Sequence, residues 1–226
     1  NPEFWSGQAP VLFPIVGCLR NGTATIGDNK TCSFGRHGLA RRLEFDLVSS
    51  SDTSVTYSLK ANDKTKEQYP YDFELQMTYE LTEHGVKVSH TVINHDSVVM
   101  PYCVGGHPAF NCPVFENESF EDYIVEFEQP ENAACAQLTE DGLINNADRV
   151  SVLENEAVIP VRHSLFYKDA LVFDALKSRK VALKHKKTGH GILVSFPDFD
   201  YLGVWSSAND GPFVALEPWS GTSTCS

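Results

Sequence analysis

The sequence lacks features that define several whole classes of protein. It contains no uninterrupted apolar run of about 18 residues, which excludes a hydrophobic transmembrane helix. Positive charge is scarce, since 18 lysines and arginines stand against 30 aspartates and glutamates, for a formal net charge of −12. Nucleic acid and anionic membrane surfaces repel such a chain, so we expect neither as a partner.

Paired cysteines and cofactor motifs are also missing. The six cysteines form no CxxC motif and no compact disulfide framework, and no secretory hydrophobic segment opens the sequence. Scattered thiols are typical of reduced proteins, so we expect a cytoplasmic location. The eight histidines are dispersed without an HExxH motif, and GxGxxG, GxxxxGK and GxSxG are absent. The sequence therefore predicts no metal site and no nucleotide cofactor.

Strand patterns, by contrast, are abundant. Phe73–Leu81 and Val86–Ile93 alternate apolar and polar residues around a turn that contains Gly85, which predicts a long β-hairpin. Five further runs are rich in β-branched and aromatic residues: Ser54–Leu59, Tyr123–Phe127, Ala170–Phe173, Gly191–Phe196 and Tyr201–Trp205. Because strands follow strands without long helices between them, the expected class is all-β, a large antiparallel β-sandwich with few short helices.

The segment 161–187 is more ambiguous, because it has no glycine or proline and its apolar residues fit either period. We predict a short turn or helix followed by a strand. Six of its basic residues lie close together in its second half: Lys177, Arg179, Lys180, Lys184, Lys186 and Lys187. They could form an anion-binding patch, but lysines that protect an edge hairpin explain them better. With no internal repeat and no linker, we expect one domain over residues 1–226.

Acid–base side chains occur in three unusual loops, of which the first covers residues 103–112. There Gly105 and Gly106 let the backbone bend freely, and Pro108 restricts His107 to an extended conformation. A histidine held on such a stiff connection suits acid–base chemistry. A core histidine bonded to the backbone is the alternative.

The second loop covers residues 212–221 and contains Glu217 between an apolar run and Pro218-Trp219. A carboxylate in such surroundings is expected to be buried, and it then needs partners or a chemical purpose. Trp205 and Trp219 can stack on the apolar face of a sugar, or they can pack in the core. A structural glutamate bonded to backbone amides is the alternative to a catalytic one.

The third loop, residues 33–42, brings His37 together with Arg36, Arg41 and Arg42. Guanidinium groups bind hydroxyl clusters, carboxylates and phosphates through paired hydrogen bonds. A solvated basic loop explains the same residues without a ligand.

Together these segments resemble the aldose 1-epimerase (galactose mutarotase) superfamily, in particular its lactose-operon-associated branch. The resemblance covers nearly the whole chain in the family's order. Its segments are Phe4-Trp5, residues 9–17 (APVLFPIVG), 37–41 (HGLAR), 69–75 (YPYDFEL), 105–111 (GGHPAFN), 169–173 (DALVF), 201–205 (YLGVW) and 217–219 (EPW).

This resemblance implies a sandwich with a sugar site in a cleft on its concave side, and cofactor-independent interconversion of the α and β anomers of a free hexose. Glu217 would be the general base and His107 the general acid. His37 and Arg41 would orient sugar oxygens, and Asp169 would bind sugar hydroxyls. Trp205 is the candidate for stacking on the sugar. Family members usually carry further strands before and after this part, so the domain is expected to lack terminal strands, which would expose sheet edges.

The chemistry suits these residue types. A glutamate with an ordinary pKa of about 4.3 is ionised at neutral pH and can accept a proton from the anomeric hydroxyl. A histidine, whose ordinary pKa of about 6.5 is raised by a neighbouring carboxylate, can protonate the ring oxygen. Neither a metal nor a nicotinamide is needed.

Other functions stay open at this point. The cluster of Arg36, Arg41 and Arg42 could bind a phosphate, which would favour a hexose-6-phosphate mutarotase. A non-catalytic carbohydrate-binding sandwich would keep an aromatic cleft but do no chemistry. A glycosidase ranks lower, because it needs a pair of carboxyl groups and the resemblance pairs a glutamate with a histidine.

Overall fold

The computed structural model describes residues 1–27 and 29–226. The strands that it defines are β1 (Val11–Leu12), β2 (Thr23–Ile26), β3 (Lys30–Ser33), β4 (Asp46–Ser50), β5 (Ser54–Lys60), β6 (Phe73–Thr82), β7 (Gly85–Asn94), β8 (Gly105–Gly106), β9 (Ala109–Asn111), β10 (Tyr123–Leu138), β11 (Ile144–Pro160), β12 (Leu171–Phe173), β13 (Lys180–His185), β14 (Gly191–Ser195), β15 (Tyr201–Trp205) and β16 (Phe213–Trp219). The helices are α1 (Asp63–Gln68) and four 3-10 helices at Arg20–Gly22, Ala40–Arg42, Phe120–Asp122 and His163–Leu165.

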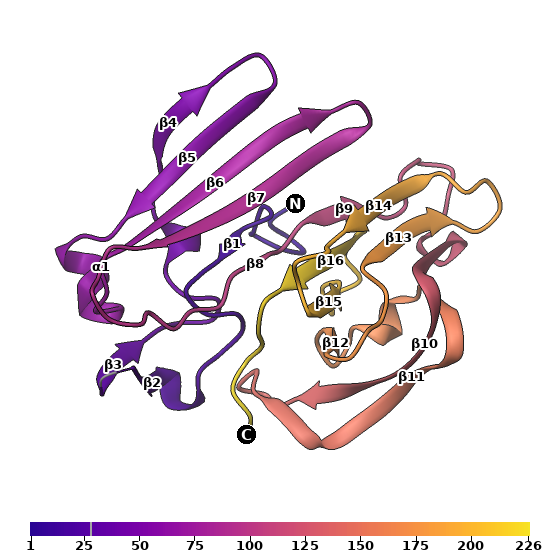
Figure 1. The fold of residues 1–226 in the computed structure, drawn as a ribbon. Helices are drawn as coiled ribbons and strands as arrows, with labels where there is room; N and C mark the ends of the chain where they lie inside the picture. The colour runs from indigo at the N-terminus through magenta and orange to yellow at the C-terminus, as the bar shows by residue number, and fades with distance from the viewer. Residues whose placement is uncertain (28) are drawn as a thin grey trace.

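The strands form antiparallel sheets, which confirms the all-β sandwich class. The sheet at the centre has the order β1-β8-β16-β15-β12, with β9 also paired to β16. A second sheet, β11-β10-β13-β14, lies against it, and a third, β4-β5-β6-β7, extends to the other side of the molecule (Figure 1). Strands β2 and β3 form a separate hairpin.

The predicted long hairpin is confirmed as β6 and β7. Thr82 pairs with Gly85, so the turn consists of Glu83 and His84. Each of the other five predicted runs also falls largely within a strand, namely in β5, β10, β12, β14 and β15.

The longest hairpin, β10–β11, was predicted only in its first five residues. The pairing of Tyr123–Leu138 with Ile144–Pro160 shifts register several times, including between Glu126 and Glu131. Each shift is a bulge or irregularity that breaks the alternation of apolar and polar residues. Pro130 within β10 further argues against a strand when the sequence is considered alone.

In the segment 161–187 the structure has a 3-10 helix followed by β12 and β13, so the predicted order is confirmed. Strands β13 and β14 form a hairpin at one edge of their sheet, with β14 outermost and β13 between β10 and β14, so the expected edge hairpin is present. Two lysines on β13 also have partners on the neighbouring strand. Lys180 has Nζ 3.4 Å from Glu128 of β10, and Lys184 forms an ion pair with Glu126. Cross-strand pairs of opposite charge stabilise a sheet.

The two faces of β16 separate the core from the cleft. Val214 and Leu216 point into the main hydrophobic core, which lies between the central sheet and the sheet of β10 and β13. By the two-residue period of a strand, Ala215, Glu217 and Trp219 point to the opposite face. A second core lies beneath β4–β7 and includes Phe73.

Part of the β4–β7 sheet carries apolar side chains that are exposed to solvent. Its exposed side chains include Leu47, Tyr79, Leu81, Val86 and Val88. A shallow hollow of about 360 Å³ lies nearby, lined by Val11, Phe45, Tyr57, Met77 and Tyr79. Its lining carries no acid–base pair, so the candidate chemistry lies elsewhere.

All six cysteines are free thiols, in agreement with the sequence-based expectation. Within residues 1–27 and 29–226, every helix is too short or too polar to span a bilayer.

Candidate active site

Strand register brings His107 and Glu217 together. Strand β16 pairs Ala215 with Ala109 of β9, and Trp219 with Gly105 of β8. The same register places Glu217 directly opposite His107 in the short gap between β8 and β9. Side chains that lie opposite each other in an antiparallel pair share one face of the sheet. Nε2 of His107 is accordingly 3.2 Å from Oε2 of Glu217.

The pair lines a cavity of about 270 Å³. This is near the lower end of the range for small-molecule sites, roughly 300–1,000 Å³. The cavity lining also contains every other predicted site residue: His37, Arg41, Asp169 and Trp205. The structure therefore gathers all six predicted residues at one place. An opening of this size suits one small molecule rather than a polymer.

Burial disfavours the charged forms of both members of the pair. It raises the pKa of Glu217 well above its ordinary value, and the neighbouring charge of Asp169 adds to the effect. Burial also lowers the pKa of His107 to about 4, and the positive charges of Arg41 and Arg36 act in the same direction.

These directions correct the sequence-based expectation of an ionised glutamate beside a histidine of raised pKa. Protonated glutamate with neutral histidine, and carboxylate with imidazolium, contain the same number of protons and have zero net charge. Burial penalises a net charge, so the pair of Glu217 and His107 retains one shared proton over a wide pH range. The shared proton can serve as the acid, and the carboxylate that releases it can serve as the base.

His37 is held as a neutral hydrogen-bond donor. Its Nδ1 accepts the backbone N–H of Gly17 at 3.0 Å, so in the neutral ring the proton lies on Nε2. The pKa of His37 is lowered to about 3, mainly by burial and in the same direction by the charges of His107, Arg41 and Arg36. At neutral pH His37 can therefore offer an N–H to a ligand oxygen without carrying a charge.

Gly38 fixes the loop that carries His37. Its φ is +74°, and a Cβ atom at this position would lie 2.3 Å from the carbonyl oxygen of Phe13. That oxygen accepts the backbone N–H groups of Leu39 and Ala40 at 3.0 and 3.2 Å. The close approach, which only glycine permits, attaches the HGLAR segment to the chain at Phe13. His37 itself has a φ of +67°, a strained conformation for a residue with a side chain.

Asp169 and Arg36 form an ion pair at the cavity. Nη1 of Arg36 lies 3.3 Å from Oδ2 of Asp169, and Oδ1 accepts the backbone N–H of Ala170 at 2.8 Å. Asp169 also has a positive φ, of 81°. With His37, it is the second cavity residue other than glycine that has a positive φ, and strained backbone of this kind clusters at functional sites.

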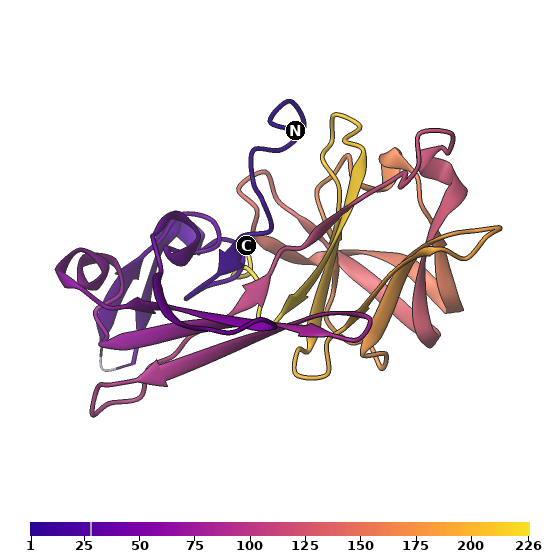
Figure 2. The ribbon, with the colours of Figure 1, turned by 90° about the horizontal axis from the view of Figure 1, so that it is seen from above.

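The aromatic wall of the cavity includes one residue that the sequence analysis did not assign to the site. Trp205 meets the His107 ring edge to face, with centroids 5.4 Å apart. Trp5 stacks on the His107 ring, with centroids 4.8 Å apart and an interplanar angle of 23°, and its ring centroid is 5.6 Å from that of Trp205. The N-terminal segment that carries Trp5 is attached near β16, because Asn209 donates a hydrogen bond to the carbonyl of Glu3 (Figure 2). The Phe4-Trp5 segment of the resemblance was the available indication.

Two buried polar atoms in the pair lack hydrogen-bond partners among the described residues. They are Nδ1 of His107 and Oε2 of Glu217. Oε2 lies within ion-pair distance of Nε2 of His107, but this contact does not have the geometry of a hydrogen bond. Buried polar atoms are nearly always bonded in native proteins, and exceptions point to a functional role. Both of these atoms belong to the pair that lines the cavity, although His163 and Ser207, which do not line it, also have such an atom.

Comparison with known proteins agrees with this architecture. The family model described as aldose 1-epimerase matches residues 2–226. The chain belongs to the aldose 1-epimerase family. It is also 44% identical over 230 residues to the plasmid-encoded protein LacX of Lactococcus lactis subsp. lactis, a match that covers 99% of this chain and 77% of LacX.

Two solved structures resemble the whole fold. A galactose mutarotase related enzyme from Lactobacillus acidophilus superposes with a TM-score of 0.91 at 32% identity, covering 100% of this chain and 75% of its own. A galactose mutarotase-like protein from Lactobacillus casei ATCC 334 gives a TM-score of 0.89 at 30% identity, over 99% of this chain and 76% of its own. Membership in this family indicates a mutarotase-type isomerase with a sugar substrate.

Proposed function

We propose that this protein is a cofactor-independent aldose 1-epimerase that interconverts the α and β anomers of a free hexose. The observation that carries the proposal is the buried pair of His107 and Glu217, opposite each other in strand register and facing one small cavity. Mutarotation needs one group to remove a proton and another to deliver one within a single sugar ring, and this pair supplies both.

In the proposed reaction, the sugar enters with its anomeric centre at the pair, and the shared proton resides on His107. Glu217 removes the proton from the anomeric hydroxyl, the bond between C1 and the ring oxygen breaks, and His107 protonates that oxygen. The product is the open aldehyde with its new hydroxyl. After rotation about the C1–C2 bond the steps run in reverse. His107 takes its proton back from the hydroxyl, Glu217 returns its proton to the carbonyl oxygen, and the ring closes on the other face of the carbonyl.

The surrounding residues are suited to hold the sugar. His37 offers a neutral N–H, and Asp169, held by Arg36, offers carboxylate oxygens to sugar hydroxyls. The flat ring of Trp205 provides an apolar surface of the kind that packs against the C–H face of a pyranose. We assign these three residues to binding, together with Arg41.

The charge balance of the cavity favours a neutral sugar over a sugar phosphate. Two arginines, Arg36 and Arg41, line it, and Arg36 is already engaged by Asp169 at 3.3 Å. Because the His107–Glu217 pair has zero net charge, Arg41 is left as a single cation among the lining residues. A phosphate would find no unpaired cluster of cations among these lining residues, so the hexose-6-phosphate alternative has less support.

An NMR measurement of anomer exchange over a panel of free and 6-phosphorylated hexoses tests the proposal. We expect the protein to accelerate exchange for at least one free hexose and to prefer it to the corresponding phosphate. Saturable sugar binding without faster exchange would identify a non-catalytic binding protein instead. A preference for the phosphate would favour the hexose-6-phosphate enzyme, and hydrolysis of a nitrophenyl glycoside would favour a glycosidase.

A further inference from the structure

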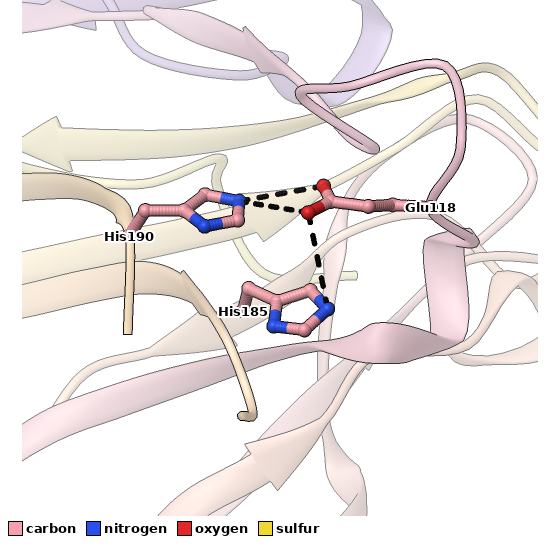
Figure 3. A group of neighbouring side chains, drawn as sticks. All are labelled: Glu118, His185 and His190. Atoms are coloured by element: carbon pink, nitrogen blue, oxygen red, sulfur yellow. Dashed lines mark hydrogen bonds and ion pairs between the residues drawn. The ribbon is translucent and has the colours of Figure 1, made fainter. Parts of the chain in front are cut away.

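Three potential metal ligands meet far from the catalytic cavity. Glu118 lies in the loop after β9, His185 ends β13, and His190 directly precedes β14. Their ligand atoms all lie within 4.8 Å of one another. Figure 3 shows both imidazoles directed at the Glu118 carboxylate from the hairpin side. Dispersed positions in the sequence hide this cluster, because only the β13–β14 turn and the loop packing bring its members together.

The distances suit one small cation. Nε2 of His190 is 3.2 Å from Oε1 of Glu118, and Nε2 of His185 is 3.9 Å from the same oxygen. A fourth possible ligand atom is close. The hydroxyl oxygen of Tyr123, which donates a hydrogen bond to Glu118, lies 3.0 Å from Nε2 of His190. Four ligands around a zinc ion at about 2.0–2.2 Å are separated by similar distances.

Thr188 holds the back of both rings. Its hydroxyl oxygen lies 3.0 Å from Nδ1 of His185 and 2.7 Å from Nδ1 of His190. An oxygen that accepts N–H from both Nδ1 atoms leaves both Nε2 lone pairs facing Glu118. Ligating histidines commonly have such an outer partner, which fixes their tautomer and orientation.

A competing set of hydrogen bonds must change for a metal to bind. Nδ1 of His185 also accepts the backbone N–H groups of Lys187 and Thr188, each at 3.2 Å. In that tautomer His185 carries its proton on Nε2 and can only donate to Glu118. Metal binding moves this proton to Nδ1, where the Thr188 hydroxyl accepts it, and both backbone hydrogen bonds to Nδ1 are then lost.

The charged surroundings of Glu118 suit a cation. In the described part of the chain, its ion pairs are with His185 and His190 alone, without a lysine or arginine to neutralise it. The His190 side chain is 29% exposed, which gives a cation access from solvent.

We propose that Glu118, His185 and His190 form a binding site for a divalent transition metal ion of the zinc class. Two imidazoles and a carboxylate favour such an ion over calcium or magnesium, which take oxygen ligands. None of the three residues lines the catalytic cavity. The site therefore stabilises the attachment of the loop after β9 to the β13–β14 hairpin rather than taking part in the sugar chemistry.

The test uses the whole protein, stripped of metal with a chelator and titrated with Zn²⁺ by calorimetry. We expect one ion per chain and a higher melting temperature with Zn²⁺. The variants His190→Gln and Glu118→Gln should each weaken binding by at least 10-fold, because loss of even an outer partner typically costs 10- to 100-fold. His84→Gln is the matched control, since His84 and Glu83 form an exposed pair at 3.7 Å without a third ligand.

A second measurement does not depend on the folding of any variant. In the unmodified protein, the imidazole ¹⁵N resonances of His185 and His190 should shift with one equivalent of Zn²⁺ while those of the other histidines stay in place. Weak binding of several ions, equal loss of binding in His84→Gln, or unchanged resonances of His185 and His190 would overturn the proposal. The group would then be a hydrogen-bonded attachment of the loop and nothing more.

Discussion

Glu131 and Glu217 are both 1% exposed, but their carboxyl groups have opposite hydrogen-bonding environments. Glu131 accepts the backbone N–H groups of Lys177 and Ser178 and the Ser178 hydroxyl, at distances between 2.7 and 3.2 Å. Oε2 of Glu217 has no such partner among the described residues. The protein therefore uses the Glu131 carboxylate to hold its chain together, and we propose that it keeps the Glu217 carboxyl group available for a ligand.

Glu217→Gln should abolish most of the activity while preserving the fold. Glutamine has nearly the same shape, but its amide cannot accept the proton of the anomeric hydroxyl. We expect the mutarotation rate to fall by roughly 10²-fold or more, the typical contribution of a general base. Polarimetry with freshly dissolved α-glucose or α-galactose measures the rate, and thermal unfolding measures the stability. Equal rates for the variant and the parent protein would exclude Glu217 as the base.

Glu131→Gln is the matched control, and it should lower the stability of the protein without changing its activity. The amide group replaces a carboxylate oxygen that faces three donors, so at least one buried donor loses its acceptor. We expect the free energy of unfolding to fall by about 2 kcal/mol, in the range for hydrogen bonds to charged groups. Chemical denaturation measures this loss, and the mutarotation rate per folded molecule should stay at the parent value. A stability equal to that of the parent would contradict the structural role of Glu131.

The sequence predicted the members of the site better than its electrostatics. His107 and Glu217 follow from glycine, proline and aromatic neighbours together with the family resemblance, and strand register then explains their contact. Their pKa directions could not be predicted, because they depend on how deeply the fold buries both groups. Trp5 was missed as a site residue for a related reason. Its place in the cavity follows from packing against His107 and Phe213, which no local pattern encodes.

The fold was predictable where strands alternate regularly, as in β6 and β7. It was not predictable where bulges interrupt the pattern, as in β10 and β11. The cluster of Glu118, His185 and His190 could not be predicted from the sequence either. Its two histidines are close in sequence, but the glutamate that completes the group is supplied by a distant loop.

The pH dependence should show a broad plateau. Addition of a second proton to the His107–Glu217 pair creates a buried positive charge, and burial lowers the pKa of His107 to about 4. Loss of the shared proton creates a buried negative charge, which burial also opposes. The alkaline limb of the pH profile is therefore shifted to higher pH. We expect kcat/KM to fall below about pH 5, to reach its plateau above that pH and to keep it through neutral pH. A limb centred near 6.5, the ordinary pKa of histidine, would show that His107 titrates as an exposed group.

His37→Asn should weaken substrate binding more than it slows the chemistry. Asparagine tolerates a positive φ, so the backbone at this position can be retained. Its shorter side chain cannot offer the N–H that Nε2 presents once Gly17 has bonded to Nδ1. We expect KM to rise by about 10-fold with a smaller change in kcat, the pattern for a group that binds substrate and transition state alike. Steady-state kinetics separate the two constants, and a large fall in kcat at constant KM would instead assign His37 to the chemical step.

Trp5→Ala should change both the protonation and the substrate affinity of the site. The indole stacks on His107 at 4.8 Å and excludes water from one side of the imidazole. Its removal hydrates the ring, so the pKa of His107 should rise from about 4 toward its ordinary value of about 6.5. The acid limb of kcat/KM should move up with it, and KM should rise because the cavity loses one wall. NMR titration of the His107 imidazole follows the pKa directly, and Trp5→Phe, which keeps an aromatic ring on His107, should stay close to the parent. If His107 titrates identically in all three proteins, the N-terminal segment does not shape the site.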